Sequence, residues 1–361
     1  MKLVTFQVQT VLGRFSRLGS LIPLGSGPNA TWAVVDLNAA AAWLLADRKD
    51  PSPQAYADAL MPQDMTQFLA LGLRSLDLAR DAEAAIRGLL KDEVTVPTGF
   101  PLSLTEGALV LPLCEDVWLQ TPLPKPNLYR DFFAFEQHVK TGFAKRGEEI
   151  PEAWYKMPVY YKGNHRSFVG PDDQIPWPAY TQKLDYELEL ACVIGREGRN
   201  IKSADAKNYI AGYTILNDFS ARDIQKLEMQ VRLGPAKGKD FATAVGPCIV
   251  TPDEIGDVKN LKMLARINGQ TVTEGNSKTC HWGFDEMIAH ASMDEVLYPG
   301  DIMGSGTVGN GCALEHDHWL KPGDAIELEI DNIGVLRNTI GEPEKPAHTD
   351  APYYKALVQK S

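Results

Sequence analysis

The stretch 184–195 begins with alternating apolar and polar residues and ends in a continuous apolar run. Side chains of a strand point alternately to its two faces, so Leu188 and Leu190 would share one face. Glu187 and Glu189 would share the other face, about 7 Å apart by the rise of a strand. Beyond Leu190 both faces are apolar, which is typical of a strand covered on both sides.

Two carboxylates that point the same way at the edge of a core repel each other unless a cation or a shared proton offsets the repulsion. Taken alone, the segment favours an edge strand with one solvated face. By parity Asp185 shares this face with the two glutamates. A functional interpretation therefore needs partners from elsewhere in the chain.

Residues 1–115 are predicted to form a small α+β unit without a cluster of polar groups, which indicates a structural or dimer-supporting role. Asp36 or Asn38 can cap the alanine-rich helix. Strands are predicted at 2–10 and 31–37, and helices at 39–46, 65–73 and 76–90. Three prolines within 122–126 break regular structure and predict a linker over 116–127.

Residues 128–345 are predicted to be a second, larger domain, followed by a tail over 346–361. The run 128–140 fits a helix, which would place Asp131 and His138 on one face. Asn268-Gly269 is a hairpin signal. Other strands are predicted at 210–216, 248–251, 261–267, 270–272, 302–304 and 325–331, and a helix at 282–292. Many strands and few helices predict an α+β, β-rich sandwich or rolled sheet.

Composition excludes several classes of function. The 361 residues are 44% hydrophobic and 23% charged, which is ordinary for a globular protein. A formal charge of −11 argues against nucleic-acid or anionic-membrane partners. No apolar run reaches the roughly 18 residues that a membrane span needs. Five scattered cysteines without a CxxC pair and a polar start fit reduced thiols and a cytoplasmic protein.

Common catalytic motifs are missing. Residues 304–309 match GxGxxG, but no βαβ unit surrounds them, so dinucleotide binding is disfavoured. A loop that donates N–H groups to an anionic substrate remains possible there. The sequence has no GxSxG elbow, no HExxH and no cysteine–histidine metal pattern.

Four carboxylates stand at the ends of predicted elements: Asp131, Glu187, Glu189 and Asp218. Ligation by oxygen alone suits a hard divalent cation, Mg²⁺, Mn²⁺ or Ca²⁺. Four carboxylates would leave excess negative charge around one cation, and Lys239 could balance part of it.

Several motifs, in this order and spacing over about 115–340, resemble the fumarylacetoacetate hydrolase family. They are Asp131-x6-His138, Asp185-Tyr186-Glu187-Leu188-Glu189-Leu190, Asn217-Asp218-Phe219-Ser220-Ala221-Arg222-Asp223-Ile224-Gln225, Gly238-Lys239 and Pro299-Gly300-Asp301 with Gly306-Thr307. The resemblance implies a mixed β-sandwich roll, usually a homodimer. It also implies that the four carboxylates bind the metal, with Mg²⁺ the preferred choice.

The resemblance further implies roles for other side chains. His138 would be the general base, oriented by Glu315. Substrate or oxyanion contacts would come from Arg222, Gln225, Lys239 and Tyr161, with Thr307 near the substrate carboxylate. Met229 stands where the family pattern has a substrate-contacting tyrosine, which leaves the substrate open.

These roles predict a hydrolase that cleaves a carbon–carbon bond in a β-diketo acid, such as fumarylacetoacetate or an acylpyruvate, in aromatic or amino-acid catabolism. The metal would act as a Lewis acid while His138 activates water. A hydratase, isomerase or decarboxylase of a related 2-keto acid is the alternative on the same metal site. A binding or scaffold protein without catalytic activity is the alternative from another class.

Overall fold

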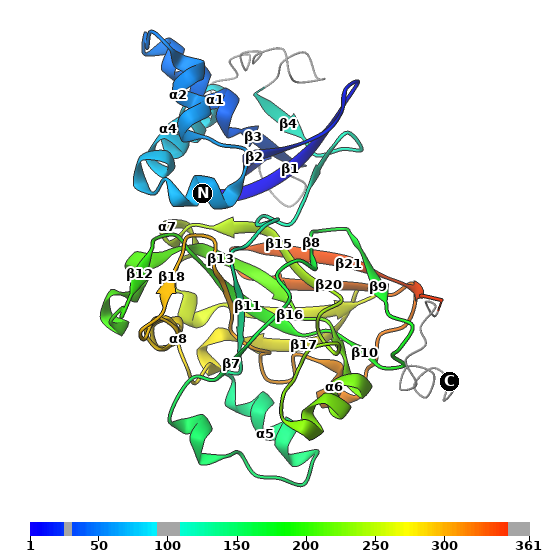
Figure 1. Cartoon of the computed structure of the whole chain (residues 1–361). Helices are drawn as coiled ribbons and strands as arrows, with labels where there is room; N and C mark the ends of the chain where they lie inside the picture. The colour runs from blue at the N-terminus through cyan, green and yellow to red at the C-terminus, as the bar shows by residue number, and fades with distance from the viewer. Residues whose placement is uncertain (25–30, 92–108, 346–361) are drawn as a thin grey trace.

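The computed structural model describes residues 1–24, 31–91 and 109–345. The predicted tail over 346–361 lies outside them. The N-terminal strands and helices gather at one end of the molecule, and α5 (Glu136–Ala144) and α6 (Arg222–Glu228) lie at the other end (Figure 1).

The N-terminal region contains the two predicted strands, β1 (Lys2–Thr10) and β3 (Thr31–Asp36). The Asp36 side chain caps α1 and accepts a hydrogen bond from the N–H of Ala39. The strand β2 (Gly13–Leu24) and the helix α2 were not predicted. The helices are α1 (Leu37–Asp47), α2 (Pro53–Leu60), α3 (Met65–Ala70) and α4 (Leu73–Lys91).

One sheet of 12 strands runs through the whole molecule. Its order is β4-β3-β2-β1-β15-β13-β11-β19-β6-β7, with β5 beside β1 and β8 beside β15. Its further strands are β4 (Val110–Pro112), β5 (Val117–Leu119), β6 (Tyr129–Phe132), β7 (Tyr160–Lys162), β8 (Phe168–Val169), β11 (Leu188–Ile194), β13 (Ile210–Asn217), β15 (Thr243–Val250) and β19 (Ile302–Gly304).

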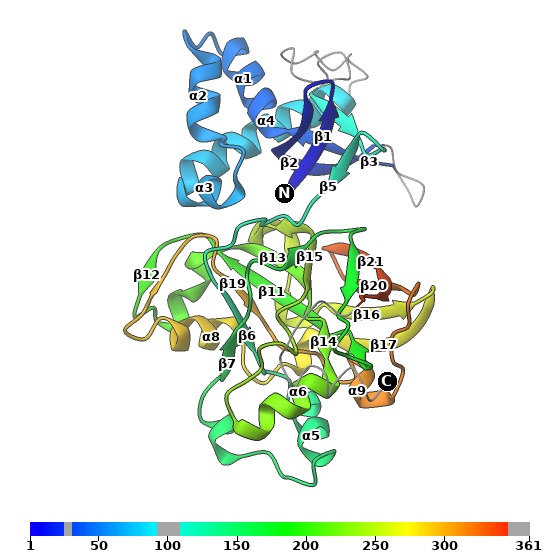
Figure 2. The ribbon, with the colours of Figure 1, turned by 45° about the vertical axis from the view of Figure 1, so that its right-hand side comes forward.

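A second sheet of five strands packs against the central part of the first (Figure 2). Its strands, in order, are β17 (Gln270–Asn276), β16 (Lys262–Ile267), β20 (Ala325–Ile330), β21 (Gly334–Pro343) and β9 (Gln174–Trp177). Asn268 and Gly269 both have positive φ, 51° and 77°, so the predicted hairpin is confirmed. The α+β, sheet-rich fold class is confirmed as well.

Short elements complete the described chain. There are two small sheets of two strands each. One consists of β10 (Leu184–Asp185) and β14 (Ser220–Ala221), and the other of β12 (Gly198–Arg199) and β18 (Val296–Leu297). The other α-helices are α7 (Pro252–Ile255), α8 (Phe284–Ala291) and α9 (Ala313–His316). The 3₁₀ turns are η1 (Glu152–Tyr155), η2 (Ser203–Tyr209), η3 (Met229–Val231), η4 (Val258–Asn260) and η5 (Ser277–Thr279).

The helix predicted over 128–140 is wrong. Its first part is the strand β6, which pairs with β19 on one side and β7 on the other, and only then does α5 begin. Pairing with strands distant in sequence outweighs the local helical pattern. Asp131 therefore lies on a strand and His138 on a helix, rather than on one helical face.

The segment 184–195 also differs from the single predicted strand. It is two strands, β10 and β11, in different sheets, with a break at Tyr186 and Glu187. At the break a side-chain oxygen replaces the backbone partner, because the N–H of Glu187 donates to Asn217 Oδ1 at 2.9 Å. The second half is buried on both faces, as its apolar pattern predicts.

The strand β11 divides two apolar clusters. Leu188 and Leu190 pack in the cluster between the two sheets, and Ala191 and Val193 pack in the cluster under the N-terminal helices. The polar end of β11 thus projects from the most buried part of the molecule.

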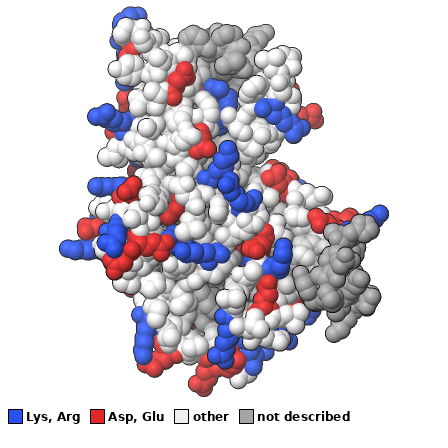
Figure 3. Space-filling view, in the orientation of Figure 1, with Lys and Arg blue, Asp and Glu red and all other residues white. Residues whose placement is uncertain are grey.

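Acidic and basic side chains are interspersed on the face drawn in Figure 3. In the part of the chain that the structure describes, no helix combines the length and the apolar character needed to cross a bilayer.

Candidate active site

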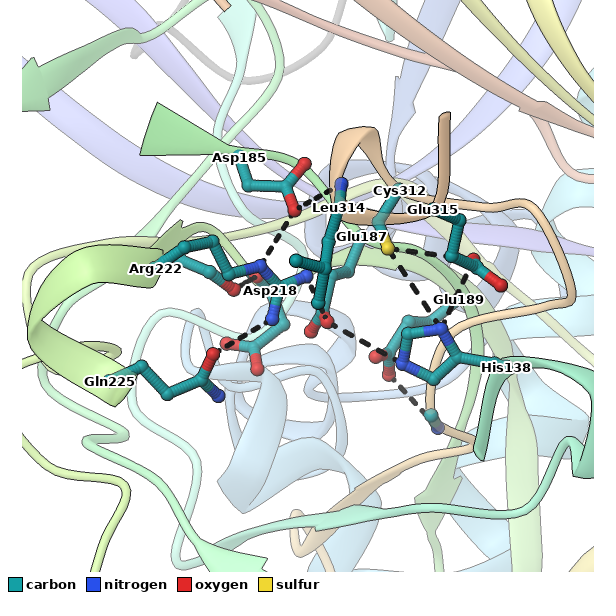
Figure 4. Close-up of polar contacts among 12 residues, drawn as sticks. His138, Asp185, Glu187, Glu189, Asp218, Arg222, Gln225, Cys312, Leu314 and Glu315 are labelled. Atoms are coloured by element: carbon teal, nitrogen blue, oxygen red, sulfur yellow. Dashed lines mark hydrogen bonds and ion pairs between the residues drawn. The ribbon is translucent and has the colours of Figure 1, made fainter. Parts of the chain in front are cut away.

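The four predicted metal ligands lie together in the structure. Asp131, Glu187, Glu189 and Asp218 are buried, and one oxygen of each lies within 4.8 Å of the others. They come from β6, the break before β11, β11 itself and the end of β13. The fold therefore gathers carboxylates from segments that are far apart in sequence; Glu187, Glu189 and Asp218 are labelled in Figure 4.

Strand register makes room for this acidic cluster. On β19, Gly304 lies opposite Asp131 of β6 and opposite Ala191 of β11. A Cβ atom at Gly304 would lie 2.6 Å from Asp131 Oδ1 and 2.7 Å from Glu189 Oε2. The glycine thus leaves the space that the carboxylates occupy.

The acidic cluster fits a hard divalent cation. Asp131 Oδ1 and Glu189 Oε1 are buried without a hydrogen-bond partner. Burial and the negative charge of Asp218 raise the pKa of Asp131, and burial and Asp131 raise the pKa of Glu189. A cation held by these oxygens would remove both penalties.

Lys239 compensates the negative charge of Glu187 and Asp218, the other two carboxylates of the acidic cluster. Its ammonium donates to Glu187 Oε2 and Asp218 Oδ2. The hydroxyl of Tyr161 donates to Asp218 Oδ2 at 2.6 Å. Burial alone would raise the pKa of Glu187, but Arg222 and Lys239 lower it below its ordinary value. Glu187 is therefore ionised, while Asp131 and Glu189 have no cationic partner among the described side chains.

Arg222 connects the acidic cluster to the rest of the predicted site. Its guanidinium donates to Glu187 Oε1 and Asp185 Oδ2, both at 2.6 Å, and to Gln225 Oε1 at 2.9 Å. Arg222 and Gln225 thus face the same side of α6, as their spacing predicts.

Asp185 is a residue whose importance the sequence reasoning missed. Its carboxylate accepts hydrogen bonds from the N–H groups of Ala313 and Leu314, at 2.7 and 3.1 Å, as well as from Arg222. It is fully buried. Its place on the same face as the glutamates was a signal, but the break at Tyr186 turns it toward α9 instead of the acidic cluster.

His138 and Glu315 form the predicted pair. His138 Nδ1 lies 3.1 Å from Glu315 Oε2, and His138 Nε2 lies 3.9 Å from Glu187 Oε1. Burial alone would raise the pKa of Glu315, but the hydrogen bond and charge of His138 lower it. One imidazole nitrogen therefore faces a carboxylate, and the other faces the acidic cluster.

The remaining predicted residue, Thr307, is buried in the loop after β19. The N–H of its neighbour Gly306 donates to Glu189 Oε2 at 3.1 Å, so this loop contacts the acidic cluster. Cys312 was not predicted to take part. Its thiol lies 3.9 Å from His138 Nδ1, although 174 residues separate the two along the chain.

Comparison with known proteins agrees with this fold. Residues 127–341 match the family described as "Fumarylacetoacetate (FAA) hydrolase C-terminal". The family match places the chain in a class of enzymes, and its buried carboxylate cluster is the candidate metal centre. The chain belongs to the fumarylacetoacetate hydrolase family, as its motifs predict.

Several relatives are named as oxaloacetate tautomerases, and two of them illustrate the likeness. The human protein "Oxaloacetate tautomerase FAHD2A, mitochondrial" is 33% identical over 285 residues, which cover 78% of this chain and 81% of that protein. "Oxaloacetate tautomerase YisK" of Bacillus subtilis (strain 168) is 34% identical over 233 residues, covering 63% and 74%.

Solved structures share the fold at lower identity. Maleylpyruvate hydrolase from Sphingobium sp. SYK-6, described in complex with manganese (II) and pyruvate, has a TM-score of 0.62 at 23% identity, covering 95% of this chain and 100% of that chain. The fumarylacetoacetate hydrolase of Exiguobacterium antarcticum has the same TM-score and identity, covering 94% and 99%.

The chain is thus a member of an enzyme family, with residues fit for a divalent cation. The hydrolytic reaction, the choice of Mg²⁺, the homodimer, the cytoplasmic location and the role of each site residue stay predictions.

Proposed function

We propose that this protein is a divalent-metal-dependent tautomerase that interconverts the keto and enol forms of a 2-keto dicarboxylate such as oxaloacetate. The observation that carries the proposal is the His138–Glu315 pair, whose free imidazole nitrogen faces the acidic cluster. The two relatives named as oxaloacetate tautomerases support the choice of reaction.

The acidic cluster would hold the cation, which would supply Lewis-acid chemistry at the keto oxygen. His138 removes a proton from the carbon next to the carbonyl, and it returns that proton to oxygen. Because Nδ1 faces Glu315, that nitrogen carries the imidazole hydrogen and leaves Nε2 free to accept. Glu315 also stabilises the positive charge on His138 after the transfer.

The carboxylates of the substrate need cationic or N–H partners. Arg222 and Lys239 are the buried cations next to the acidic cluster. Gln225, Tyr161 and Thr307 add polar groups from α6, β7 and the loop after β19. A ligand with a carboxylate on either side of a keto group fits this distribution of donors.

The test is exchange of the C3 protons of oxaloacetate with deuterium, followed by NMR with Mg²⁺ or Mn²⁺ present. His138→Ala is expected to lower the catalysed rate by roughly 10²–10⁴-fold, the usual contribution of a positioned base. His165→Gln, at a histidine outside the site, is the control. Full exchange activity in His138→Ala would show that the base is assigned wrongly.

Hydrolysis of an acylpyruvate is the second candidate, because the same pair can activate water instead of accepting a carbon-bound proton. Release of pyruvate from an acylpyruvate measures it, and release of carbon dioxide from oxaloacetate measures the decarboxylase alternative. Cleavage without C3 exchange would favour the hydrolase. Calorimetric titration with millimolar Mg²⁺ or Mn²⁺ tests the scaffold alternative, which the absence of any binding would favour.

A further inference from the structure

A second group of side chains that can act as metal ligands lies beside the acidic cluster. It consists of His138 and Glu315, which the proposed reaction uses, and Cys312, which it does not use. Cys312 Sγ lies 3.5 Å from Glu315 Oε2 and 3.9 Å from His138 Nδ1. His138 Nδ1 and Glu315 Oε2 are 3.1 Å apart. A thiol, an imidazole and a carboxylate thus converge on one point (Figure 4).

These separations suit a single tetrahedral ion. Zinc bonds of about 2.0 Å to nitrogen or oxygen and about 2.3 Å to sulfur place two ligands roughly 3.3–3.6 Å apart. The separation of 3.5 Å lies inside that range, 3.1 Å lies below it and 3.9 Å lies above it. Shifts of a few tenths of an ångström would therefore complete the site.

A further observation also points to a ligand here. Glu315 Oε1 is buried without a hydrogen-bond partner, and the side chain of Glu315 is only 1% exposed. Three protein ligands leave the fourth tetrahedral position to a water molecule.

The two groups differ in chemical preference. The acidic cluster offers only oxygen, which suits hard cations such as Mg²⁺ and Mn²⁺. The group with Cys312 offers sulfur and nitrogen as well, which suits Zn²⁺ and other thiophilic ions. A hard ion would therefore bind at the acidic cluster, and a thiophilic ion would bind at the neighbouring group with Cys312.

We propose that His138, Cys312 and Glu315 form an inhibitory site for a thiophilic divalent cation such as Zn²⁺. On binding, the Cys312 thiol loses its proton to solvent and becomes a thiolate ligand. The lone pair of His138 Nδ1 goes to the metal, so the imidazole hydrogen moves to Nε2. Nε2 can then no longer accept a proton from substrate. The inhibition rests on the proposed function of His138, but the binding site does not.

Cobalt(II) is the spectroscopic probe. With the protein in saturating Mg²⁺, one equivalent of Co²⁺ is expected to give a thiolate-to-cobalt charge-transfer band, together with the intense visible bands of a tetrahedral ion. Zn²⁺ should abolish both by displacement. Cys312→Ser and Cys312→Ala should lack the charge-transfer band, whereas Cys114→Ser, at an exposed free cysteine, should keep it.

Zinc inhibition of C3 exchange is the second measurement, expressed relative to the zinc-free rate of each variant. Loss of Cys312 is expected to raise the Zn²⁺ concentration for half inhibition by at least 10-fold, because loss of even an outer partner of a metal ligand costs roughly 10–100-fold in affinity. No charge-transfer band, or a band that persists in both Cys312 variants, would overturn the site. Equal zinc sensitivity with and without Cys312 would overturn the inhibition.

Discussion

Asp185 shows how a residue outside the acidic cluster can determine its geometry. One buried carboxylate holds Arg222 on α6 and the first N–H groups of α9, the helix that carries Glu315. Arg222 and the helix that carries Glu315 are therefore positioned by the same side chain. Neither contact is visible in the sequence, because both depend on the break in the chain at Tyr186.

Asp185→Asn is expected to lower kcat by roughly 10–100-fold with a smaller change in KM. The amide carries no negative charge, and loss of a charged hydrogen bond costs about 1.5–3 kcal/mol. Steady-state measurement of kcat and KM tests this expectation. Lys226→Gln, at an exposed residue of the same helix, is the control; an equal loss there would indicate a general effect on α6.

The raised pKa values of Asp131 and Glu189 make stability depend on pH and on metal. Their ordinary values are 3.8 and 4.5, and the folded protein raises both. The folded state thus binds protons more tightly than the unfolded state, so metal-free stability falls as pH rises from about 4 through the raised values.

A divalent cation binds the ionised carboxylates, so its stabilising effect should grow over the same range of pH. We expect Mg²⁺ at 100 times its Kd at pH 8 to add about 2.7 kcal/mol to the free energy of unfolding at that pH. The same Mg²⁺ concentration should add clearly less at pH 5.5. Thermal denaturation with Mg²⁺ or with a chelator measures this. Glu189→Gln should reduce the effect of Mg²⁺ at pH 8; an unchanged effect would place the cation elsewhere.

At the scale of elements, the sequence predicts structure that local patterns determine, but it does not predict structure that depends on long-range strand pairing. The apolar run after Leu190 predicts the buried part of β11 correctly, because burial on both faces leaves a direct mark on the sequence. The alternation before it did not reveal the break at Tyr186 and Glu187. The helix predicted over 128–140 failed, since β6 is a strand only through its pairing with β19 and β7. The four carboxylates were found because they stand at the ends of predicted elements and in the motifs that resemble the family. The contacts of Asp185 and Cys312 were not found.

Gly304→Ala is expected to weaken metal binding at least 10-fold while the fold persists. The new methyl group would meet Asp131 Oδ1 and Glu189 Oε2 at less than 3 Å, so both carboxylates must move. Calorimetric titration with Mn²⁺ measures affinity, and circular dichroism checks the fold. Gly142→Ala on α5, where nothing lies within 4 Å, is the matched control and should bind Mn²⁺ normally.

At the scale of the whole molecule, the N-terminal region shares a sheet and a core with the catalytic part. Lys2 and Leu3 of β1 pair with Val250 and Ile249 of β15. The apolar cluster under the N-terminal helices also contains Val193 of β11. The division into a unit over 1–115 and a catalytic domain stays a prediction, and this shared core is an argument that the two parts unfold together.

Leu3→Ala decides between these views. Leu3 is fully buried beside β15, so truncating it should lower the free energy of unfolding by about 2–5 kcal/mol. If the parts share one cooperative unit, urea unfolding should shift to the same lower midpoint whether followed by far-UV circular dichroism or by loss of bound Mn²⁺ at the acidic cluster. Leu12→Ala, at a leucine 81% exposed, is the control and should leave the midpoint unchanged. A midpoint for Mn²⁺ loss that stays at the wild-type value would instead support an independent N-terminal domain, because destabilising β1 would then not reach the strands that carry Asp131 and Glu189.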